Sequence, residues 1–265
     1  MGTVSVVIPT FNDDPAHLAE AVASVQAQTV PVEVVVVDDG SDVPVVLDGV
    51  RVIRQDNAGP SAARNAGIRA TSGEFIYPLD ADDRIEPGVI ARLVEAMTED
   101  VAIAYPVVDM FGLRAGRTPS LPETTLNDLV VFNRIVSAAL FRRTDWEQVG
   151  GYVEGRGFPE DWVLWATILG RAGRRAVRVD EAVLHYRQRP GSLNATQSSP
   201  VGLVAARRQI ARALPDRRED LVQAATDQAL IWLSELEQAR ADASRWRRVE
   251  SIWRPFVRVR RLLRS

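Results

Sequence analysis

Four short runs of β-branched residues, separated by segments with helical spacing, constrain the fold of this chain more than any other feature. The runs lie at residues 4–8, 32–37, 50–54 and 74–79. β-branched residues favour strands, and apolar residues three to four positions apart favour helices that pack on them. Because parallel neighbours need crossover connections, this alternation predicts an α/β fold with an open, mostly parallel sheet and helices on both faces.

The later segments continue the α/β pattern. Asp14 and Pro15 fit the N-cap and first position of a helix, and Pro87 is placed to open another. Residues 108–135 have weak periodicity and several glycines and prolines, so we expect an excursion on the binding face. A strand near residues 137–141, a helix over 160–172 and strands at 176–179 and 183–187 complete the domain.

A helical region follows from about residue 201. Its apolar residues keep helical spacing, which predicts a long amphipathic helix. We therefore expect a domain over residues 1–200 and a C-terminal helical appendage over residues 201–265. The apolar positions of the long helix are Leu221, Ala224, Ala225, Ala229, Leu230, Leu233 and Leu236.

Composition narrows the possible chemistry. Hydrophobic residues make up 46% and charged residues 25% of the 265 positions, as in ordinary globular proteins. Cysteine is absent, which excludes disulfides, thiolate nucleophiles and cysteine zinc sites. All 32 basic residues are arginine, which excludes a Schiff-base lysine and the lysine of a phosphate-binding P-loop. Any metal must therefore be held by oxygen or histidine.

Charge is distributed unevenly along the chain. The net charge is −3, but residues 244–265 contain eight Arg and one Glu, which is +7 and leaves −10 for the remainder. So acidic a body disfavours nucleic-acid binding. The sequence has no run of about 18 apolar residues, and residues 1–9 lack the segments of a signal peptide. A cytoplasmic location is the resulting expectation.

Polar residues follow the first two predicted strands. Pro9, Thr10 and Asn12 end the first, and Asp38 and Asp39 begin an Asp-Asp-Gly-Ser sequence after the second. In an open α/β sheet, ligands bind outside the carboxyl ends of the strands. A carboxylate there can accept hydrogen bonds from a base or ribose, although the same four residues also fit a strand-ending turn.

A turn-and-helix sequence comes next, at residues 57–67. It begins at Asn57, and Gly59 and Pro60 set a tight turn into a helix whose amino end could face anions. Arg64 is suited to a diphosphate because its planar fork carries five donors. The alternative for Arg64 is a solvated surface charge.

Three carboxylates follow the fourth strand. Asp80, Asp82 and Asp83 would repel one another unless a cation lies between them, and hard oxygen ligands favour Mg²⁺ or Mn²⁺. Such a metal would neutralise a leaving nucleoside diphosphate. A solvated acidic turn is the alternative, but it does not explain acidic pairs at two separate strand ends.

Two later positions carry candidate functional groups. Glu160 and Asp161 open a predicted helix, where they either cap it or take a proton from an attacking hydroxyl. His185, one of two histidines, either adds a nitrogen ligand to the metal, contacts phosphate, or is purely structural.

In this order, the clusters resemble those of family 2 glycosyltransferases, inverting enzymes of GT-A fold. The resemblance covers about residues 3–190, and its specificity lies in the joint order of short pieces. The Gln-x-x-Arg-Trp motif of processive members does not occur, so a single transfer per encounter is expected. The matching residues are 4–12, 37–41, 57–67, 80–83, Gly150-Gly151-Tyr152 and Glu160-Asp161.

The resemblance implies roles for individual residues. Asp161, next to Glu160, would be the catalytic base, and Asp80 and Asp82 would form the metal motif, with Asp82 the direct ligand. Arg64 would lie close to the nucleotide base or the diphosphate of the donor. The commonest donors in the family are UDP-sugars. The expected nucleotide-sugar contacts are Pro9, Thr10, Asn12, Asp39, Asn57, Arg64 and Asp80, and the expected metal ligands are Asp82, Asp80 and His185.

Other protein classes fit less of the chain. A receiver-like phosphoacceptor domain would account for Asp38 and Asp39 but not for the later acids. A nucleotidyltransferase would need a glycine-rich loop after the first strand, where residues 12–15 contain no glycine. A noncatalytic sugar-nucleotide binding module stays as an alternative that a donor-hydrolysis assay separates.

The C-terminal residues suggest a location and an acceptor. Residues 244–265 mix arginine with Trp246, Trp253 and Phe256, which favours docking on anionic lipid. We therefore expect an enzyme that is peripheral on the inner face of the membrane and transfers sugar to a hydroxyl acceptor that is lipid-linked. Cell-surface polysaccharide, glycolipid or glycoprotein synthesis would use such a reaction. Pro255 interrupts a single helix, so a tail that is packed on the acidic body or disordered is the alternative.

Overall fold

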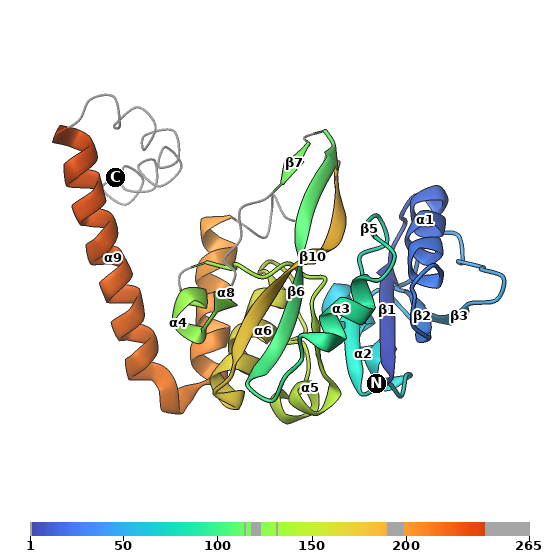
Figure 1. Ribbon diagram of the computed structural model, residues 1–265, viewed down its shortest axis with the longest axis horizontal. Coiled ribbons are helices and arrows are strands. Elements are labelled where there is room, and N and C mark those ends of the chain that lie inside the picture. The colour runs from blue at the N-terminus through green and yellow to red at the C-terminus, as the bar shows by residue number, and fades with distance from the viewer. Residues whose placement is uncertain (1, 114, 118–122, 131, 190–198, 242–265) are drawn as a thin grey trace. The chain divides into compact units, whose positions relative to one another are not determined.

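The computed structural model describes residues 2–113, 115–117, 123–130, 132–189 and 199–241 (Figure 1). It divides into two compact units, Met1–Arg218 and Glu219–Ser265. The first unit contains the whole sheet and therefore all the residues discussed below as a site.

Four parallel strands form the amino-terminal half of the sheet. β1 is central, pairing with β2 and β4, and β3 extends the sheet from β2. Thr10 lies opposite Asp38 in the β1–β2 register, so both strands end at the same edge. The strands are β1 (Val4–Thr10), β2 (Val32–Asp38), β3 (Arg51–Arg54) and β4 (Phe75–Pro78).

The other half of the sheet is mixed. β9 joins the halves, running antiparallel to both β4 and β6, whereas the long ladder between β6 and β10 is parallel. The longer ladders are thus parallel, and the short strands supply the antiparallel pairs. These strands are β5 (Arg84–Ile85), β6 (Val101–Gly112), β7 (Gly116–Arg117), β8 (Glu123–Thr124), β9 (Leu140–Arg142) and β10 (Arg175–Gln188).

Helices cover both faces of the sheet, as expected. α1 (Pro15–Gln26) and α3 (Val89–Glu95) pack on the face that carries Val6 and Ile8. The opposite face carries Val7, where Gly67 of α2 (Pro60–Arg69) approaches so closely that a Cβ would lie 2.4 Å from Val7 Cγ1. This alternation follows from the two-residue period of a strand.

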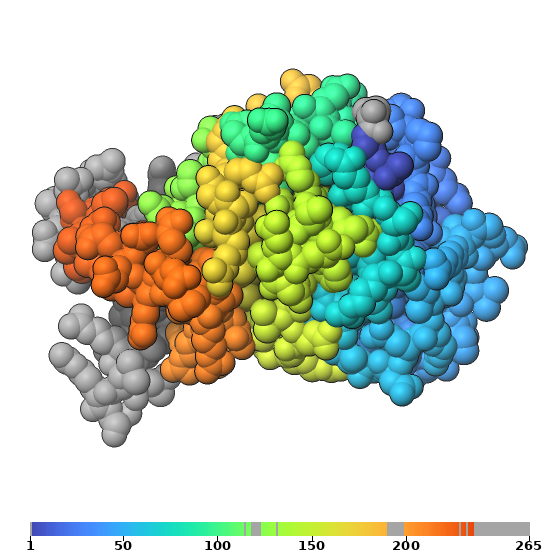
Figure 2. All heavy atoms as spheres, turned by 90° about the horizontal axis from the view of Figure 1, so that it is seen from below, coloured from blue at the N-terminus to red at the C-terminus, as the bar shows by residue number. Residues whose placement is uncertain are grey.

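Two further helices lie on the same face as α2. Phe141 of β9 packs edge-to-face on Trp165 of α6 (Glu160–Ala172), with ring centroids 5.4 Å apart. Trp146 of α5 (Arg143–Val149) donates to Asn65 of α2 at 3.3 Å. Figure 2 shows this side of the molecule, with the cyan residues of α2 beside the yellow-green residues of α5.

The segment expected as an excursion is partly a strand. Residues 108–112 continue β6, because they pair with residues 184–188 of β10. The two strands expected at 176–179 and 183–187 are one, β10, with an irregularity between Val179 and Val183. A short helix, α4 (Leu126–Leu129), follows and is capped by Thr125 and Asp128.

The described part of the C-terminal region is helical, as expected. α8 (Pro200–Ala213), which buries Ala206 and Ile210, belongs to the first unit and is followed by the short turn η1 (Pro215–Arg217). α9 (Arg218–Ala241) buries Leu221 but leaves Leu230 and Leu233 more than half exposed. None of the described helices combines the length and apolar character that a membrane crossing requires. The basic segment 244–265 lies outside the described residues.

Candidate functional site

The loops after β1 and β2 lock together at the sheet edge. Asn12 adopts a left-handed backbone (φ 53°), and its N–H donates to Ser41 Oγ at 3.0 Å. Its side chain donates to the Asp42 carboxylate at 3.2 Å and accepts from the Asp42 N–H at 2.9 Å. Thr10 donates to Asp13 at 3.1 Å. Pro9 and Thr10 therefore border a rigid edge.

Asp38 holds its own loop. Its buried carboxylate accepts from the N–H groups of Ser41 at 2.9 Å and Val45 at 3.2 Å, and it pairs with Arg54. Burial raises the pKa of Asp38, but these hydrogen bonds outweigh it, so the net shift is downward. Asp38 is thus a structural anion.

Asp39 holds the turn that leads into α2. Its Oδ1 accepts from Gln55 Nε2 at 2.7 Å and from the Ala58 N–H at 3.0 Å, and its Oδ2 accepts from the Gly59 N–H at 2.8 Å. Gly59 has φ 94°, which favours glycine at this turn. The carboxylate expected at the nucleotide therefore also shapes the loop beside it.

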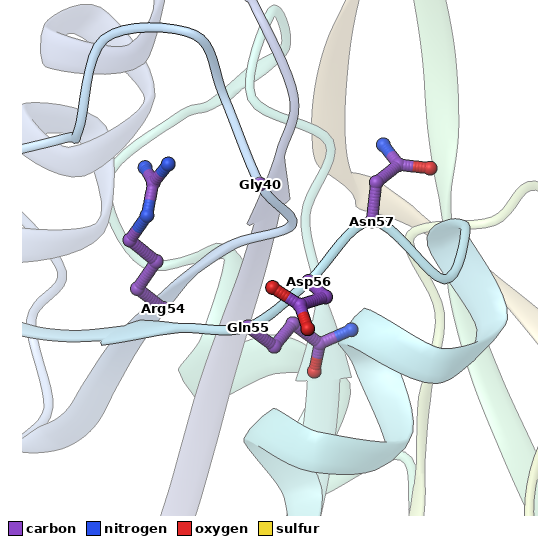
Figure 3. Close-up of a pocket in the computed structure, with 5 residues that line it drawn as sticks. All are labelled: Gly40, Arg54, Gln55, Asp56 and Asn57. Carbon is purple, nitrogen blue, oxygen red and sulfur yellow. The ribbon is translucent and has the colours of Figure 1, made fainter.

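A pocket of about 550 Å³ lies next to this turn. In Figure 3, Arg54 and Asn57 lie on either side of Gln55 and Asp56, and Gly40 of the loop after β2 also lines the pocket. Asn57 accepts a hydrogen bond from Arg156, which comes from the segment before α6. The pocket is large enough for a small ligand and is lined by polar groups that can orient one.

Arg64 links two acidic segments from a buried position. It is only 4% exposed, and its guanidinium donates to Asp80 Oδ1 and Glu160 Oε1, both at 2.7 Å. It also lies over the Tyr152 ring, 5.6 Å from the centroid. Burial lowers the pKa of Arg64, but the carboxylates of Asp80 and Glu160 raise it by more than burial lowers it. The guanidinium therefore stays charged. Because it is buried, Arg64 is not a solvated surface charge.

The acidic turn at residues 80–83 brings three carboxylates close together. Burial and the Asp80 carboxylate raise the pKa of Asp82, while Arg189, 2.7 Å from Asp82, lowers it. Burial, Asp80 and Asp82 hold the pKa of Asp83 well above its ordinary value. Asp83 Oδ1 accepts from the Arg187 N–H at 2.8 Å, whereas its buried Oδ2 has no partner among the described residues. Such a carboxylate cluster favours an added cation.

Asp161 lies in the first turn of α6 next to Glu160. Its Oδ1 accepts from the Trp162 N–H at 2.7 Å, and its Oδ2 accepts from Asn133 Nδ2 at 2.9 Å. Burial and the Glu160 carboxylate raise the pKa of Asp161 to about 7. A carboxylate with this pKa is suited to exchange a proton near neutral pH.

His185 contacts a different acidic residue, Glu86. Its Nε2 is 3.2 Å from Glu86 Oε1, and its ring packs edge-on against Phe111 at 6.4 Å. No three acidic or histidine residues in the described part of the chain are arranged to hold a metal ion by themselves. A cation at Asp80 and Asp82 would thus need further ligands from a bound molecule or water.

Three contacts are not evident from the acidic motifs. Ser137 donates to Asp80 Oδ2 at 3.2 Å, and Asn133 contacts Asp161. Asn65 accepts from the Tyr152 N–H and donates to the Tyr152 carbonyl, both at 2.9 Å, which pins the Gly150-Gly151-Tyr152 segment to α2. Asn65 falls within the turn-and-helix sequence 57–67, whereas no spacing signal identifies Asn133.

The fold and these strand-end acids define an α/β protein with a site at the carboxyl edge of its sheet. The model of the glycosyl transferase family 2 matches residues 5–153, more than half of the chain. The chain therefore belongs to glycosyltransferase family 2.

Known relatives and structures agree with this assignment. The succinoglycan biosynthesis protein ExoO of Rhizobium meliloti is 34% identical over 217 residues, covering 72% of this chain and 62% of ExoO. The uncharacterized glycosyltransferase EpsJ of Bacillus subtilis is 28% identical, covering 74% of this chain and 64% of EpsJ. The chain thus spans less than two thirds of these relatives.

Solved structures confirm the GT-A-type fold. The S. aureus TarS 1-349 structure in complex with UDP-GlcNAc superposes with a TM-score of 0.63 at 20% identity, covering 80% of this chain and 66% of that one. The same protein in complex with UDP gives a TM-score of 0.56. At this identity the likeness concerns the fold alone.

Proposed function

We propose that this chain is an inverting, metal-dependent glycosyltransferase that moves a single sugar from a nucleotide-sugar to an acceptor hydroxyl. The observation that carries the proposal is the Arg64 bridge. One buried guanidinium contacts Asp80 of the acidic turn and Glu160 beside Asp161. This bridge supports the proposal that a cation at the acidic turn and a base in α6 act in one site.

In this proposal, Asp161 acts as the base. Its raised pKa suits removal of the proton from the acceptor hydroxyl as that oxygen attacks the anomeric carbon. The bond to the nucleoside diphosphate breaks on the opposite side, so the configuration inverts. Glu160 is held by Arg64 and contributes negative charge next to Asp161.

The acidic turn fits a divalent cation. Asp80 and Asp82 would hold Mn²⁺ or Mg²⁺, which prefer oxygen ligands, and the mutual repulsion that raises the pKa values of Asp82 and Asp83 would be relieved. When bound, the cation offsets the charge of the departing diphosphate. His185 is left out of this set because it contacts Glu86.

The donor is proposed to be a UDP-sugar. Fold similarity to a protein crystallised with UDP-GlcNAc and UDP supports this choice. The pocket at residues 54–57 would take the nucleotide, with Asp39, Asn57 and the β1 edge at Pro9, Thr10 and Asn12 around it.

Metal-dependent nucleotide binding tests the proposal. With UDP and Mn²⁺ at about 100 times the dissociation constant, the melting temperature should rise by about 5–10 °C. The Asp82→Asn variant should lose the part of the shift that depends on Mn²⁺, because it removes a carboxylate ligand. Differential scanning fluorimetry with UDP, GDP, CDP and UDP-GlcNAc, with and without Mn²⁺, measures both effects.

The matched control is Asp48→Asn, which removes the same charge from an exposed loop position. This variant should keep the full Mn²⁺-dependent shift. If Asp82→Asn also keeps it, Asp82 does not bind the metal.

The basic segment 244–265 is proposed to hold the enzyme on an anionic membrane surface, near a lipid-linked acceptor. The support is its sequence alone, because these residues lie outside the described structure. Full-length protein should float with phosphatidylglycerol vesicles and stay unbound with phosphatidylcholine vesicles. A truncation after Ala243 should lose this binding; equal flotation of both proteins contradicts the proposal.

The competing classes predict different contacts. A receiver-like domain needs a free acidic pair after β2, but Asp38 and Asp39 both hold loop backbone. A noncatalytic binding module would bind donor and metal without turnover. Release of UDP from UDP-sugars by the wild-type protein separates that alternative from an enzyme.

A further inference from the structure

Asp161 has a neighbour that the acidic motifs do not include. Asn133, in the segment between α4 and β9, donates from Nδ2 to Asp161 Oδ2 at 2.9 Å. Its Oδ1 accepts from the N–H of Ile135, a buried residue, at 3.2 Å. Since the amide oxygen is paired with a backbone donor, the amide nitrogen is the atom that faces Asp161.

The donors to Asp161 differ from those of the neighbouring acids. Asp80 and Glu160 each accept from the charged guanidinium of Arg64. Asp161 accepts from two neutral groups among the described residues, the Asn133 amide and the Trp162 N–H. A charged donor binds a carboxylate about twice as strongly and lowers its basicity more. A neutral donor orients the carboxylate while leaving it able to take a proton.

The two donors also leave acceptor sites on the Asp161 carboxylate unoccupied. A carboxylate has about four acceptor sites on its two oxygens, and the two donors occupy one on each oxygen. The carboxylate plane is thus fixed from both ends, by α6 and by the segment before β9. An acceptor hydroxyl can still bind to a remaining site.

We infer that Asn133 is a positioning residue that orients the Asp161 carboxylate and favours its ionised form during glycosyl transfer. This inference rests on the proposed function, in which Asp161 is the base. Asn133 does not exchange the proton itself, because an amide N–H is not acidic. Its role is to fix the direction from which Asp161 meets the acceptor hydroxyl.

Two substitutions of Asn133 test the inference. Asn133→Ala removes the donor, so Asp161 should titrate about one pH unit higher than in the wild type. Asn133→Asp keeps the size of the side chain and an oxygen for the Ile135 N–H, but places a second carboxylate against Asp161. The shared negative charge should raise the titration midpoint at least as far.

Carbon-13 NMR of protein labelled at aspartate Cγ measures the midpoint without any substrate. The signal that is missing from the Asp161→Asn variant identifies Asp161. Thr125→Ala is the matched control, because Thr125 caps α4, the helix that precedes Asn133, and its side chain donates to Asp128 rather than to Asp161. It should leave the midpoint unchanged even if the segment loosens.

Turnover then separates the possible outcomes. An upward shift in both Asn133 variants, with the acid limb of the rate profile moving by the same amount, supports the inference. An unchanged titration in both variants overturns the inference even when Asp161→Asn is inactive. Wild-type turnover by Asp161→Asn overturns both the base assignment and the role of Asn133.

Discussion

The Asp161→Asn variant should lose about 100- to 10,000-fold in turnover, because an amide cannot take the proton of the acceptor hydroxyl. The variant keeps an oxygen that can accept from Trp162 or Asn133, so donor binding should change little. Release of UDP in the presence of acceptor measures the rate, and titration with UDP and Mn²⁺ measures binding. A folded variant with the wild-type rate would show that another group is the base.

The rate of the wild-type enzyme should also depend on pH, through the protonation of Asp161. With the pKa of Asp161 raised to about 7, the rate should fall with decreasing pH below that value, as the carboxylate becomes protonated. Above it the rate should level off. A flat profile from pH 5 to 8 would contradict the assignment.

The stability of Asp161→Asn tests the raised pKa of Asp161 independently of turnover. The folded-state pKa of Asp161 lies above the unfolded value of about 3.9, so the folded protein binds this proton more tightly. The free energy of unfolding contributed by Asp161 therefore falls as pH rises from about 4 to 7. The asparagine side chain does not ionise, so Asp161→Asn should not lose this stability. Its melting temperature should exceed that of the wild type at pH 8, and the difference should shrink toward pH 4.

Local sequence signals are sufficient for part of the fold. The helix expected over residues 160–172 is found with those bounds, since it opens with two acids, keeps an apolar face and ends before Gly173. Asp14 caps α1 through the Ala16 N–H at 2.9 Å, as its type and the following proline predict. Each of these signals lies within a few residues of the boundary it sets.

Strands buried on both faces are harder to predict. Residues 101–108 of β6 are all buried, so their sequence is a continuous apolar run without alternation. Such a run fits a strand or a buried helix equally well. Its main partner β10 lies far along the chain, and residues 108–112 are a strand because they pair with β10 and, at Asp109 and Met110, with β7.

The candidate site, like the fold, can be predicted from the sequence only in part. The acids at 80–83 and 160–161 are evident from residue type and position, because parallel strands end at one edge. Which groups neutralise them is not evident: Arg64 and Glu160 are 96 residues apart, and nothing in local spacing joins them. Local spacing predicts Arg64 as a diphosphate ligand or a solvated charge, and it does not predict the two carboxylates between which the fold buries it.

Arg64→Met should be the most destabilising of the substitutions considered. Methionine has a similar length but no charge, so Asp80 and Glu160 would be left without their guanidinium, and Glu160 is buried. Removing one partner of a buried ion pair costs about 3–5 kcal/mol. Urea unfolding at pH 7.5, analysed by linear extrapolation, measures the loss.

The pH dependence and a matched variant show whether the lost charge is the cause. Lowering the pH should recover part of the stability of Arg64→Met, because the abandoned carboxylates become protonated. Arg84→Met removes an arginine that is 44% exposed and 3.4 Å from an equally exposed Glu20, and it should cost about 1 kcal/mol or less. Equal losses in the two variants would mean that the Arg64 bridge does not hold the acidic segments together, and the site would then have to depend on the sheet edge alone.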